Sequence, residues 1–195
     1  MARKDFDLIT EWVEPDSRIL DLGCGDGSLL RLLNKKRNTS GYGVDTSIDK
    51  TIKSLDNKIN IINADINDHM DFFKDKSFDY VILAQSLQVV DNPVSLIKEM
   101  LRIGNEVIIS FPNMGYWRSR LYLFFKGEMP VTSELPFSWH STPNIHLCTI
   151  RDFKKMCMSN NFQITEEVIN NANGKNISSS LLNNLTGTSA IFRIK

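Results

Sequence analysis

A glycine-rich segment separates the first strand expected in this chain from the helix that follows it. Asp21 to Gly27 reads Asp-Leu-Gly-Cys-Gly-Asp-Gly, after the apolar run 18–20 and before the leucine-rich stretch 28–33. Alternate glycines permit backbone conformations that a Cβ disfavours and let a ligand lie directly on the main chain. The amides and the dipole at the start of the next helix favour a carboxylate or phosphate. The segment therefore predicts a strand, a tight turn and a helix that bind a nucleotide-like ligand.

The spacing of the glycines narrows the kind of ligand. A dinucleotide fingerprint reads G-x-G-x-x-G, whereas here Gly23, Gly25 and Gly27 alternate and Ser28 stands where that fingerprint has its last glycine. The pattern D-x-G-x-G-x-G resembles motif I of the class I S-adenosylmethionine-dependent methyltransferases. The alternative is a glycine turn that closes a βα unit without a ligand.

Two acidic residues further along favour the ligand. Asp45 ends the run 41–45, and Asp65 follows the apolar run 59–64. An acidic side chain at the end of the second strand can accept hydrogen bonds from both ribose hydroxyls. In the class I pattern, a residue at the place of Asp65 binds the adenine amino group and the next side chain, here Ile66, packs on the ring. Either Asp alone is more often a helix cap or a loop residue, but three matches in order form a stronger signal.

Apolar runs and helical patterns alternate through the first 112 residues. The expected strands lie near 18–23, 40–45, 59–65, 78–84 and 106–111. The expected helices lie near 4–14, 27–37, 47–56, 68–74 and 93–103. This alternation predicts an α/β fold with a doubly wound, mostly parallel sheet and helices on both faces. Ligands bind such sheets at the carboxyl ends of the strands, where Gly23, Asp45, Asp65 and Gln85 fall.

The alternation stops after Pro112. Residues 113–147 are rich in aromatic residues and prolines without a clear period, and a loop of this length is often functional. A short helix is possible over 117–125. The patterns that follow predict a helix over 149–159, a strand over 163–168, a mobile loop over 170–189 and a final antiparallel strand over 190–194. We expect seven strands in a single domain spanning 1–195. Residues 113–147 would form a family-specific insertion after the fifth strand.

Composition excludes several kinds of partner. Lys and Arg together number 23, as do Asp and Glu, so the net charge of zero gives no electrostatic footprint for a nucleic acid. The basic run 35–37 is either a local patch or a complement to a helix dipole. No apolar run approaches the roughly 20 residues that span a bilayer, and the N-terminus lacks a signal sequence. Cys24, Cys148 and Cys157 lack zinc-like spacing and suit reduced thiols in a cytoplasm.

The sequence identifies no catalytic residue. Transfer of a methyl group from a sulfonium ion depends more on positioning than on an acid or base. The segment 84–88 does not match the Asn/Asp-Pro-Pro-Tyr/Phe motif of methyltransferases that act on nucleic-acid amino groups. His69, His140 and His146 lack metal-ligand spacing, so we expect no metal site, and each is either a general base or a structural residue.

Two arginines and several aromatic residues in the insertion leave alternatives open. Arg118 and Arg120 either bind a carboxylate or phosphate, or pair with acidic residues of this chain or of a partner. The aromatic residues between 116 and 139 are of the types enriched at protein interfaces, and they equally suit a core.

Three segments of this region resemble the signature segments of MetW, a family of bacterial methionine-biosynthesis proteins. They read Pro-Asn-Met-Gly-Tyr-Trp-Arg-Ser-Arg-Leu, Gly-Glu-Met-Pro-Val-Thr and Thr-Pro-Asn-Ile-His-Leu-Cys-Thr-Ile-Arg-Asp-Phe, at 112–121, 127–132 and 142–153. The resemblance includes the glycine loop, 41–45 and 85–88, and it extends to about residue 170. The chain departs from the usual family pattern at 114–116, at Ser86 and at 137–141, and the last departure weakens any catalytic role for residues 140 and 141.

The resemblance implies a class I methyltransferase fold and a function in methionine synthesis. It implies homoserine O-acyltransferase, the MetX protein, as a partner, for which this chain would be a required or regulatory subunit. The alternative is a methyltransferase that acts on a small molecule, and a homo-oligomer is left open. The implied cofactor is S-adenosylmethionine or S-adenosylhomocysteine (SAH). It would be bound by Asp21, Gly23, Cys24, Gly25, Gly27, Asp45, Thr46, Ala64, Asp65, Ile66 and Gln85.

Overall fold

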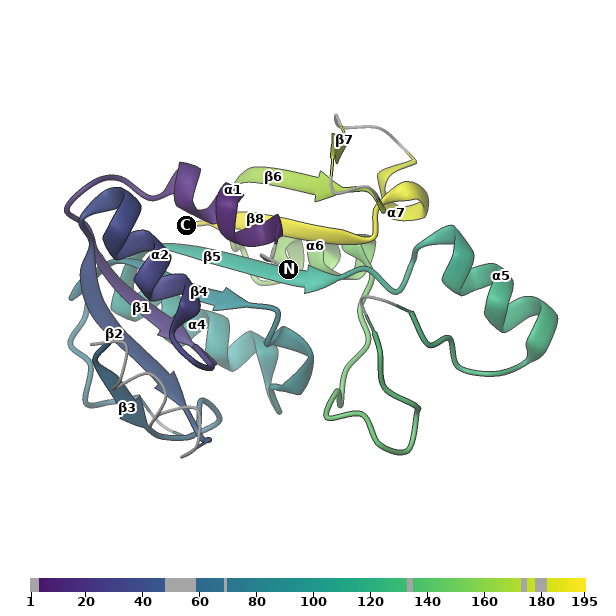
Figure 1. The fold of residues 1–195 in the computed structure, drawn as a ribbon, viewed down its shortest axis with the longest axis horizontal. Coiled ribbons are helices and arrows are strands. Elements are labelled where there is room, and N and C mark those ends of the chain that lie inside the picture. The colour runs from purple at the N-terminus through teal and green to yellow at the C-terminus, as the bar shows by residue number, and fades with distance from the viewer. Residues whose placement is uncertain (1–3, 48–58, 69, 133–134, 173–174, 178–181) are drawn as a thin grey trace.

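One mixed sheet organises the molecule (Figure 1). The computed structural model describes residues 4–47, 59–68, 70–132, 135–172, 175–177 and 182–195. Its strands are β1 Arg18–Leu22, β2 Ser40–Asp45, β3 Ile61–Asn63, β4 Phe78–Ala84, β5 Gly104–Pro112, β6 Ile164–Asn170, β7 Asn176–Ile177 and β8 Ser189–Ile194. Its helices are α1 Lys4–Trp12, α2 Ser28–Arg37, α4 Pro93–Ile103, α5 Trp117–Lys126, α6 Ile150–Ser159 and α7 Asn183–Thr186, with a 3-10 turn η1 at Leu87–Val89.

The strand order is β3-β2-β1-β4-β5-β8-β6-β7. The pairs from β3 to β5 are parallel, and β8 runs antiparallel to both β5 and β6. The expected mostly parallel sheet with an antiparallel final strand is therefore confirmed. The expected count of seven strands is wrong by one, because Asn176 and Ile177 fold back and pair with the end of β6 as β7.

The helix expected over 68–74 does not form in the described residues of that segment. Arg102 instead donates hydrogen bonds to the carbonyl oxygens of Phe73 (2.9 Å) and Met70 (3.3 Å). Both hydrophobic side chains are buried. Burial and a distant arginine thus determine this backbone, and neither is visible in a local pattern. The helix expected over 47–56 falls on residues 48–58, which lie outside the described part of the chain.

The loop expected over 170–189 contains two short elements, β7 and α7. The side-chain Nδ2 of Asn113, which directly follows β5, donates to the carbonyl oxygens of Asn184 (3.1 Å) and Gly187 (2.8 Å). This side chain attaches α7 to the carboxyl edge of the sheet. The sequence of 170–189 is polar, and such long-range bonds leave no local signal in it.

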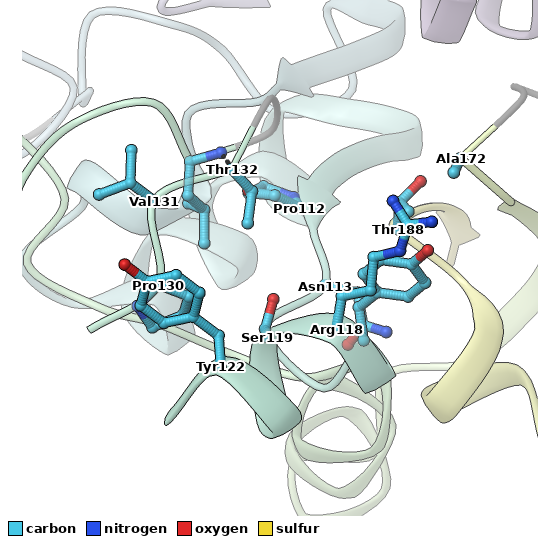
Figure 2. Close-up of a pocket in the computed structure, with 12 residues that line it drawn as sticks. Pro112, Asn113, Arg118, Ser119, Tyr122, Pro130, Val131, Thr132, Ala172 and Thr188 are labelled. Carbon is cyan, nitrogen blue, oxygen red and sulfur yellow. Dashed lines mark hydrogen bonds between the residues drawn. The ribbon is translucent and has the colours of Figure 1, made fainter. Parts of the chain in front are cut away.

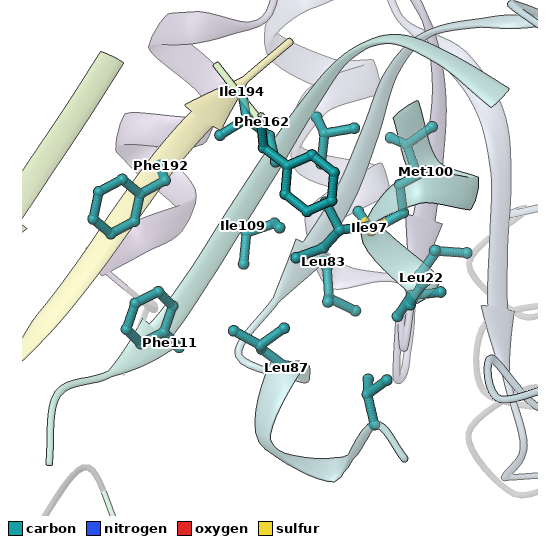
Figure 3. Close-up of a cluster of buried hydrophobic side chains, with 14 of the residues drawn as sticks. Leu22, Leu83, Leu87, Ile97, Met100, Ile109, Phe111, Phe162, Phe192 and Ile194 are labelled. Atoms are coloured by element: carbon teal, nitrogen blue, oxygen red, sulfur yellow. The ribbon is translucent and has the colours of Figure 1, made fainter. Parts of the chain in front are cut away.

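Helices cover both faces of the sheet, as expected. Alternate strand residues face opposite ways, so Leu20 joins one buried cluster and Ile19 the other. The first cluster packs against α4 and α6, and the second against α1 and α2. Figure 3 shows part of the first cluster, from Leu22 and Leu83 across Ile97 and Met100.

Three buried rings attach α6 and β8 to the end of β5. The centroid of Phe111 lies 5.8 Å from that of Phe192 and 4.9 Å from that of Phe153, and the last two are 4.7 Å apart. Phe111 and Phe192 stand on neighbouring antiparallel strands (Figure 3). This cluster supports the point at which the chain leaves the sheet and enters 113–147.

We expect Phe192→Ala to lower the free energy of unfolding by about 3–5 kcal/mol, because it removes a fully buried ring and leaves a cavity. Phe124→Ala is the matched control, since its ring is 79% exposed and its loss should change stability by no more than about 0.5 kcal/mol. Urea unfolding measures both. Equal effects of the two substitutions would contradict the packing described.

Candidate functional site

The glycine turn follows β1 and begins α2. Gly23, Gly25 and Gly27 have φ angles of 69°, 59° and 71°, in the left-handed region that glycine adopts without strain. The backbone N–H groups of Gly23 and Cys24 both donate to the carbonyl oxygen of Val44, at 2.8 and 3.1 Å. The turn is therefore held against the end of β2.

Gly23 and Gly25 differ in the space available beside their Cα atoms. A Cβ at Gly23 would come within 2.6 Å of Ser86 Oγ, so this glycine is needed for close packing. A Cβ at Gly25 would meet no atom of the described residues within 4 Å. No described side chain therefore fills the space beside the Gly25 Cα.

Asp45, at the end of β2, is bonded to the glycine turn. Its Oδ2 accepts a hydrogen bond from Gly25 N (2.8 Å), and its Oδ1 accepts one from Ser47 N (2.9 Å). The residue is 8% exposed. A carboxylate has about four lone-pair sites, so each oxygen retains capacity to accept from a hydroxyl.

Cys24 packs against β2. A Cβ at Gly43 would lie 2.4 Å from Cys24 Sγ, so the thiol fills the space that this glycine leaves. This contact makes Cys24 a packing residue of the turn. Asp21, on β1, is 2% exposed.

The ends of β2 and β3 are joined by side-chain and backbone bonds. Asn63 Nδ2 donates to the carbonyl oxygens of Asp45 (3.1 Å) and Thr46 (3.2 Å), and Ala64 N donates to the carbonyl oxygen of Asp45 (3.3 Å). These bonds hold the backbone of Thr46 and Ala64 next to that of Asp45. The sequence analysis missed Asn63, whose position on a strand gives no sign of this role.

Asp65 begins the turn that follows β3. Its Oδ1 accepts a hydrogen bond from Asn67 N (2.9 Å). Ile66 is 9% exposed and belongs to the buried cluster against α4, so only an edge of its side chain reaches solvent.

Gln85 stands at the end of β4 with a φ of 60°. Its N–H donates to the backbone oxygen (2.9 Å) and the hydroxyl (3.1 Å) of Ser110 on β5. The Ser110 hydroxyl in turn donates to Asp5 Oδ2 (3.0 Å), a buried carboxylate of α1. The carboxyl edge of the sheet is therefore tied to the N-terminal helix. Sequence reasoning missed Asp5, because an acidic residue in the first turn of a helix resembles an ordinary surface charge.

A carboxylate of the chain itself occupies the start of α2. Asp26 Oδ1 accepts hydrogen bonds from the hydroxyl (2.6 Å) and the N–H (3.1 Å) of Ser28. The hydroxyl bond is the main cause that lowers the pKa of Asp26 below its usual value, so the side chain is charged at neutral pH. A second negative group is disfavoured beside it. The start of α2 therefore suits a ligand without a phosphate group. The sequence alone had allowed either a carboxylate or a phosphate at this place.

The described histidines and Arg120 have structural surroundings. His140 lies beside the ring of Trp139, and His146 Nε2 lies 3.3 Å from the carbonyl oxygen of Asp91. Arg120 Nε donates to the carbonyl oxygen of Gly115 (2.6 Å). His69 lies outside the described residues. Within the described ranges, no cluster of three His, Cys, Asp or Glu side chains is arranged to hold a metal ion.

The sheet order, the antiparallel β8 and the glycine turn after β1 define the class I methyltransferase fold. A solved S-adenosylmethionine-dependent methyltransferase from Mesorhizobium loti matches 99% of this chain and 98% of its own, with a TM-score of 0.72 and 13% identity. The plantazolicin methyltransferase BpumL in complex with SAH matches 98% of this chain and 80% of its own, with a TM-score of 0.66 and 17% identity. At these identities the likeness shows the fold alone.

The chain belongs to the MetW family. The family model described as methionine biosynthesis protein MetW matches residues 3–194. A bifunctional methionine biosynthesis protein MetXA/MetW from Rhodopirellula baltica is 38% identical over 173 residues, which cover 84% of this chain. The match spans only 28% of that relative's length.

None of the described helices has the length and apolar character that a membrane span requires.

Two thiols close to α6 are strongly perturbed. Burial, with a smaller contribution from Asp152, raises the pKa of Cys148 to about 12, and burial raises the pKa of Cys157 to about 11. Both thiols are therefore protonated at neutral pH and poor nucleophiles. Neither is a candidate for covalent catalysis.

We expect iodoacetamide to alkylate Cys148 and Cys157 far more slowly at pH 8 in the folded protein than in urea. The folded protein holds both protons more tightly than the unfolded chain, so the free energy of unfolding should fall as pH rises above about 9. Mass spectrometry of each cysteine peptide measures the rates. Equal folded and unfolded rates at pH 8 would contradict the raised pKa values.

Proposed function

We propose that this chain binds S-adenosylmethionine and acts as a subunit of a homoserine O-acyltransferase in methionine synthesis. The observation that carries the proposal is the relative whose name joins MetXA and MetW. Joining two modules in one polypeptide raises their effective concentration for each other, which benefits modules that work together.

The geometry of the glycine turn supports S-adenosylmethionine as the ligand. No described side chain fills the space beside the Gly25 Cα, and Asp45 retains acceptor capacity for the two ribose hydroxyls. Asp65 would accept from the adenine amino group, with the exposed edge of Ile66 against the ring. Asp26 disfavours a phosphate at the helix start, and S-adenosylmethionine has none. The remaining residues of the proposed ligand site are Gly23, Gly27, Thr46, Ala64 and Gln85. Asp21 and Cys24 would stabilise the turn that carries the site.

The exposed face of α5 is the proposed contact with the acyltransferase. Phe124 and Phe125 are 79% and 76% exposed, and their rings meet edge to face at 5.1 Å. Figure 1 shows α5 standing away from the sheet, beyond the carboxyl end of β5. Exposed apolar patches mark interaction sites, and aromatic residues are enriched in them. Trp139 and Phe137 add further exposed rings within the same insertion.

We expect replacement of Phe124 and Phe125 by Ser to weaken the complex with the acyltransferase of the same organism by at least about tenfold, since aromatic anchors often contribute about 2 kcal/mol or more. Sedimentation velocity of the mixed proteins measures the complex. Met158→Ser is the matched control, because Met158 is equally exposed but lies on α6. An unchanged affinity in the double variant would place the contact elsewhere.

We expect Asp45→Ala to weaken S-adenosylmethionine binding by roughly a hundredfold, because hydrogen bonds to a charged group contribute about 1.5–3 kcal/mol each. Titration calorimetry measures the affinity, and Asp71→Ala, an exposed carboxylate, is the control.

Asp45 also holds the turn, so Gly25→Ala provides a second test of the same ligand site. Its side chain would enter the space proposed for the ligand while meeting no atom of the described residues within 4 Å, although the left-handed φ adds some backbone strain. Normal S-adenosylmethionine affinity in both variants would remove this ligand site from the proposal.

A second candidate function is methyl transfer to a small molecule. The ordered set of Gly23, Gly25, Gly27, Asp45 and Asp65 favours it, together with the fold that S-adenosylmethionine-dependent enzymes share. Incubation with S-adenosylmethionine and homoserine, its O-acyl esters or homocysteine discriminates the two functions. Formation of SAH only when an acceptor is present would support an enzyme, and its absence would favour the subunit role.

A further inference from the structure

A cavity of about 320 Å³ lies between α5 and the carboxyl end of β5, well away from the glycine turn. Pro130 and Val131 line one side of it, and Asn113, Arg118 and Thr188 line another (Figure 2). Leu135 also lines it. This volume is at the lower end of the range of about 300–1,000 Å³ for small-molecule sites. None of the described residues that line the cavity belongs to the proposed S-adenosylmethionine site, so the cavity is a separate site.

Ser119 places a hydroxyl group in the cavity. Ser119 is 4% exposed, and its hydroxyl points into the cavity in Figure 2. No hydrogen bond joins Ser119 Oγ to another described residue, and the oxygen is not among the fully buried polar atoms that lack a partner. The hydroxyl is therefore open to the cavity, where a ligand can accept its proton.

The cavity has a positive electrostatic character. Arg118 is the one charged side chain among its described lining residues, and its guanidinium lies 5.4 Å from the ring centroid of Trp117. Within the described ranges, Arg118 forms no ion pair with an acidic residue. Since no described carboxylate pairs with this guanidinium, it can pair with a ligand anion in the cavity.

The start of α5 adds to this character. Tyr116 precedes the helix and provides no side-chain cap, so the first-turn N–H groups near Arg118 and Ser119 have no partner from a cap. The positive end of the helix dipole favours an anion at the same place. Pro130, Val131 and Leu135 present an apolar surface across the cavity, which suits a short hydrocarbon body.

We propose that this cavity binds a small molecule with a carboxylate and a short aliphatic body. The carboxylate would pair with the Arg118 guanidinium and accept the Ser119 hydroxyl proton, and the aliphatic part would pack on the apolar side. A carboxylate matches the planar fork of a guanidinium in a bidentate manner. The site goes beyond the proposed function, because it is independent of S-adenosylmethionine binding at the glycine turn.

The test is titration of the full chain with butyrate, followed by ligand-observed NMR, with butylamine and 1-butanol as probes of the same length. We expect saturable binding of butyrate and none of butylamine. Arg118→Gln should weaken butyrate binding by at least about tenfold, through loss of the charged pair, and Ser119→Ala by several-fold. Arg151→Gln is the matched control, because Arg151 is exposed on α6 and does not line the cavity.

Three results would overturn the proposal. They are no saturable butyrate binding, equal binding by the Arg118→Gln and Arg151→Gln variants, and stronger binding of inorganic phosphate than of butyrate at the same residues. Thermal unfolding shows that each variant is folded, and Ser119→Phe, which fills the cavity, should abolish butyrate binding. None of these outcomes depends on the acyltransferase or on S-adenosylmethionine, so this proposal fails or survives separately from the proposed function.

Discussion

The carboxylate of Asp45 holds together the edge of the sheet on which the proposed ligand site depends. One oxygen accepts from Gly25 N and the other from Ser47 N, so a single side chain joins the glycine turn to the chain beyond β2. The backbone around it is anchored as well, because Val44 accepts two bonds from the turn and Asn63 reaches the Asp45 carbonyl oxygen. The residue proposed to bind ribose is thus also the residue that shapes the site.

A second side chain, Asn113, organises the insertion in a comparable way. Its amide nitrogen donates to α7 and to Gly187, and its Oδ1 accepts from Gly115 N (2.9 Å) and Ile150 N (3.2 Å). With four bonds and 3% exposure, it fixes the start of the segment leading to α5 against α6 and α7. The cavity and the exposed aromatic face of α5 both belong to the segment that Asn113 anchors. A stable base is what a segment needs if it is to present one surface to a ligand and another to a partner protein.

The parts of the fold that depend on short, repeated patterns could be predicted from the sequence. Asn92 and Pro93 mark the start of α4, and Asn92 Oδ1 does accept from Ser95 N (3.1 Å). The glycines, whose spacing requires a turn, have the left-handed φ angles that such a turn uses. The predictions that failed concern segments whose conformation depends on residues far away in the sequence. Arg102 determines the backbone near Phe73, and Asp5 reaches β5 across more than a hundred residues, so neither contact leaves a local signal. The cavity beside α5 is formed by residues of several separate segments and could not be predicted for the same reason.

The central proposal is that this chain binds S-adenosylmethionine and acts as a subunit of a homoserine O-acyltransferase, and the two parts together predict that the ligand alters the acyltransferase rate through this chain. The direct measurement is the rate of O-acylhomoserine formation by the homoserine O-acyltransferase of the same organism, with and without an equimolar amount of this chain, each with and without S-adenosylmethionine. The account predicts that the rate changes when the chain is added, and changes again with S-adenosylmethionine only when the chain is present. An acyltransferase whose rate is the same in all four mixtures would contradict it.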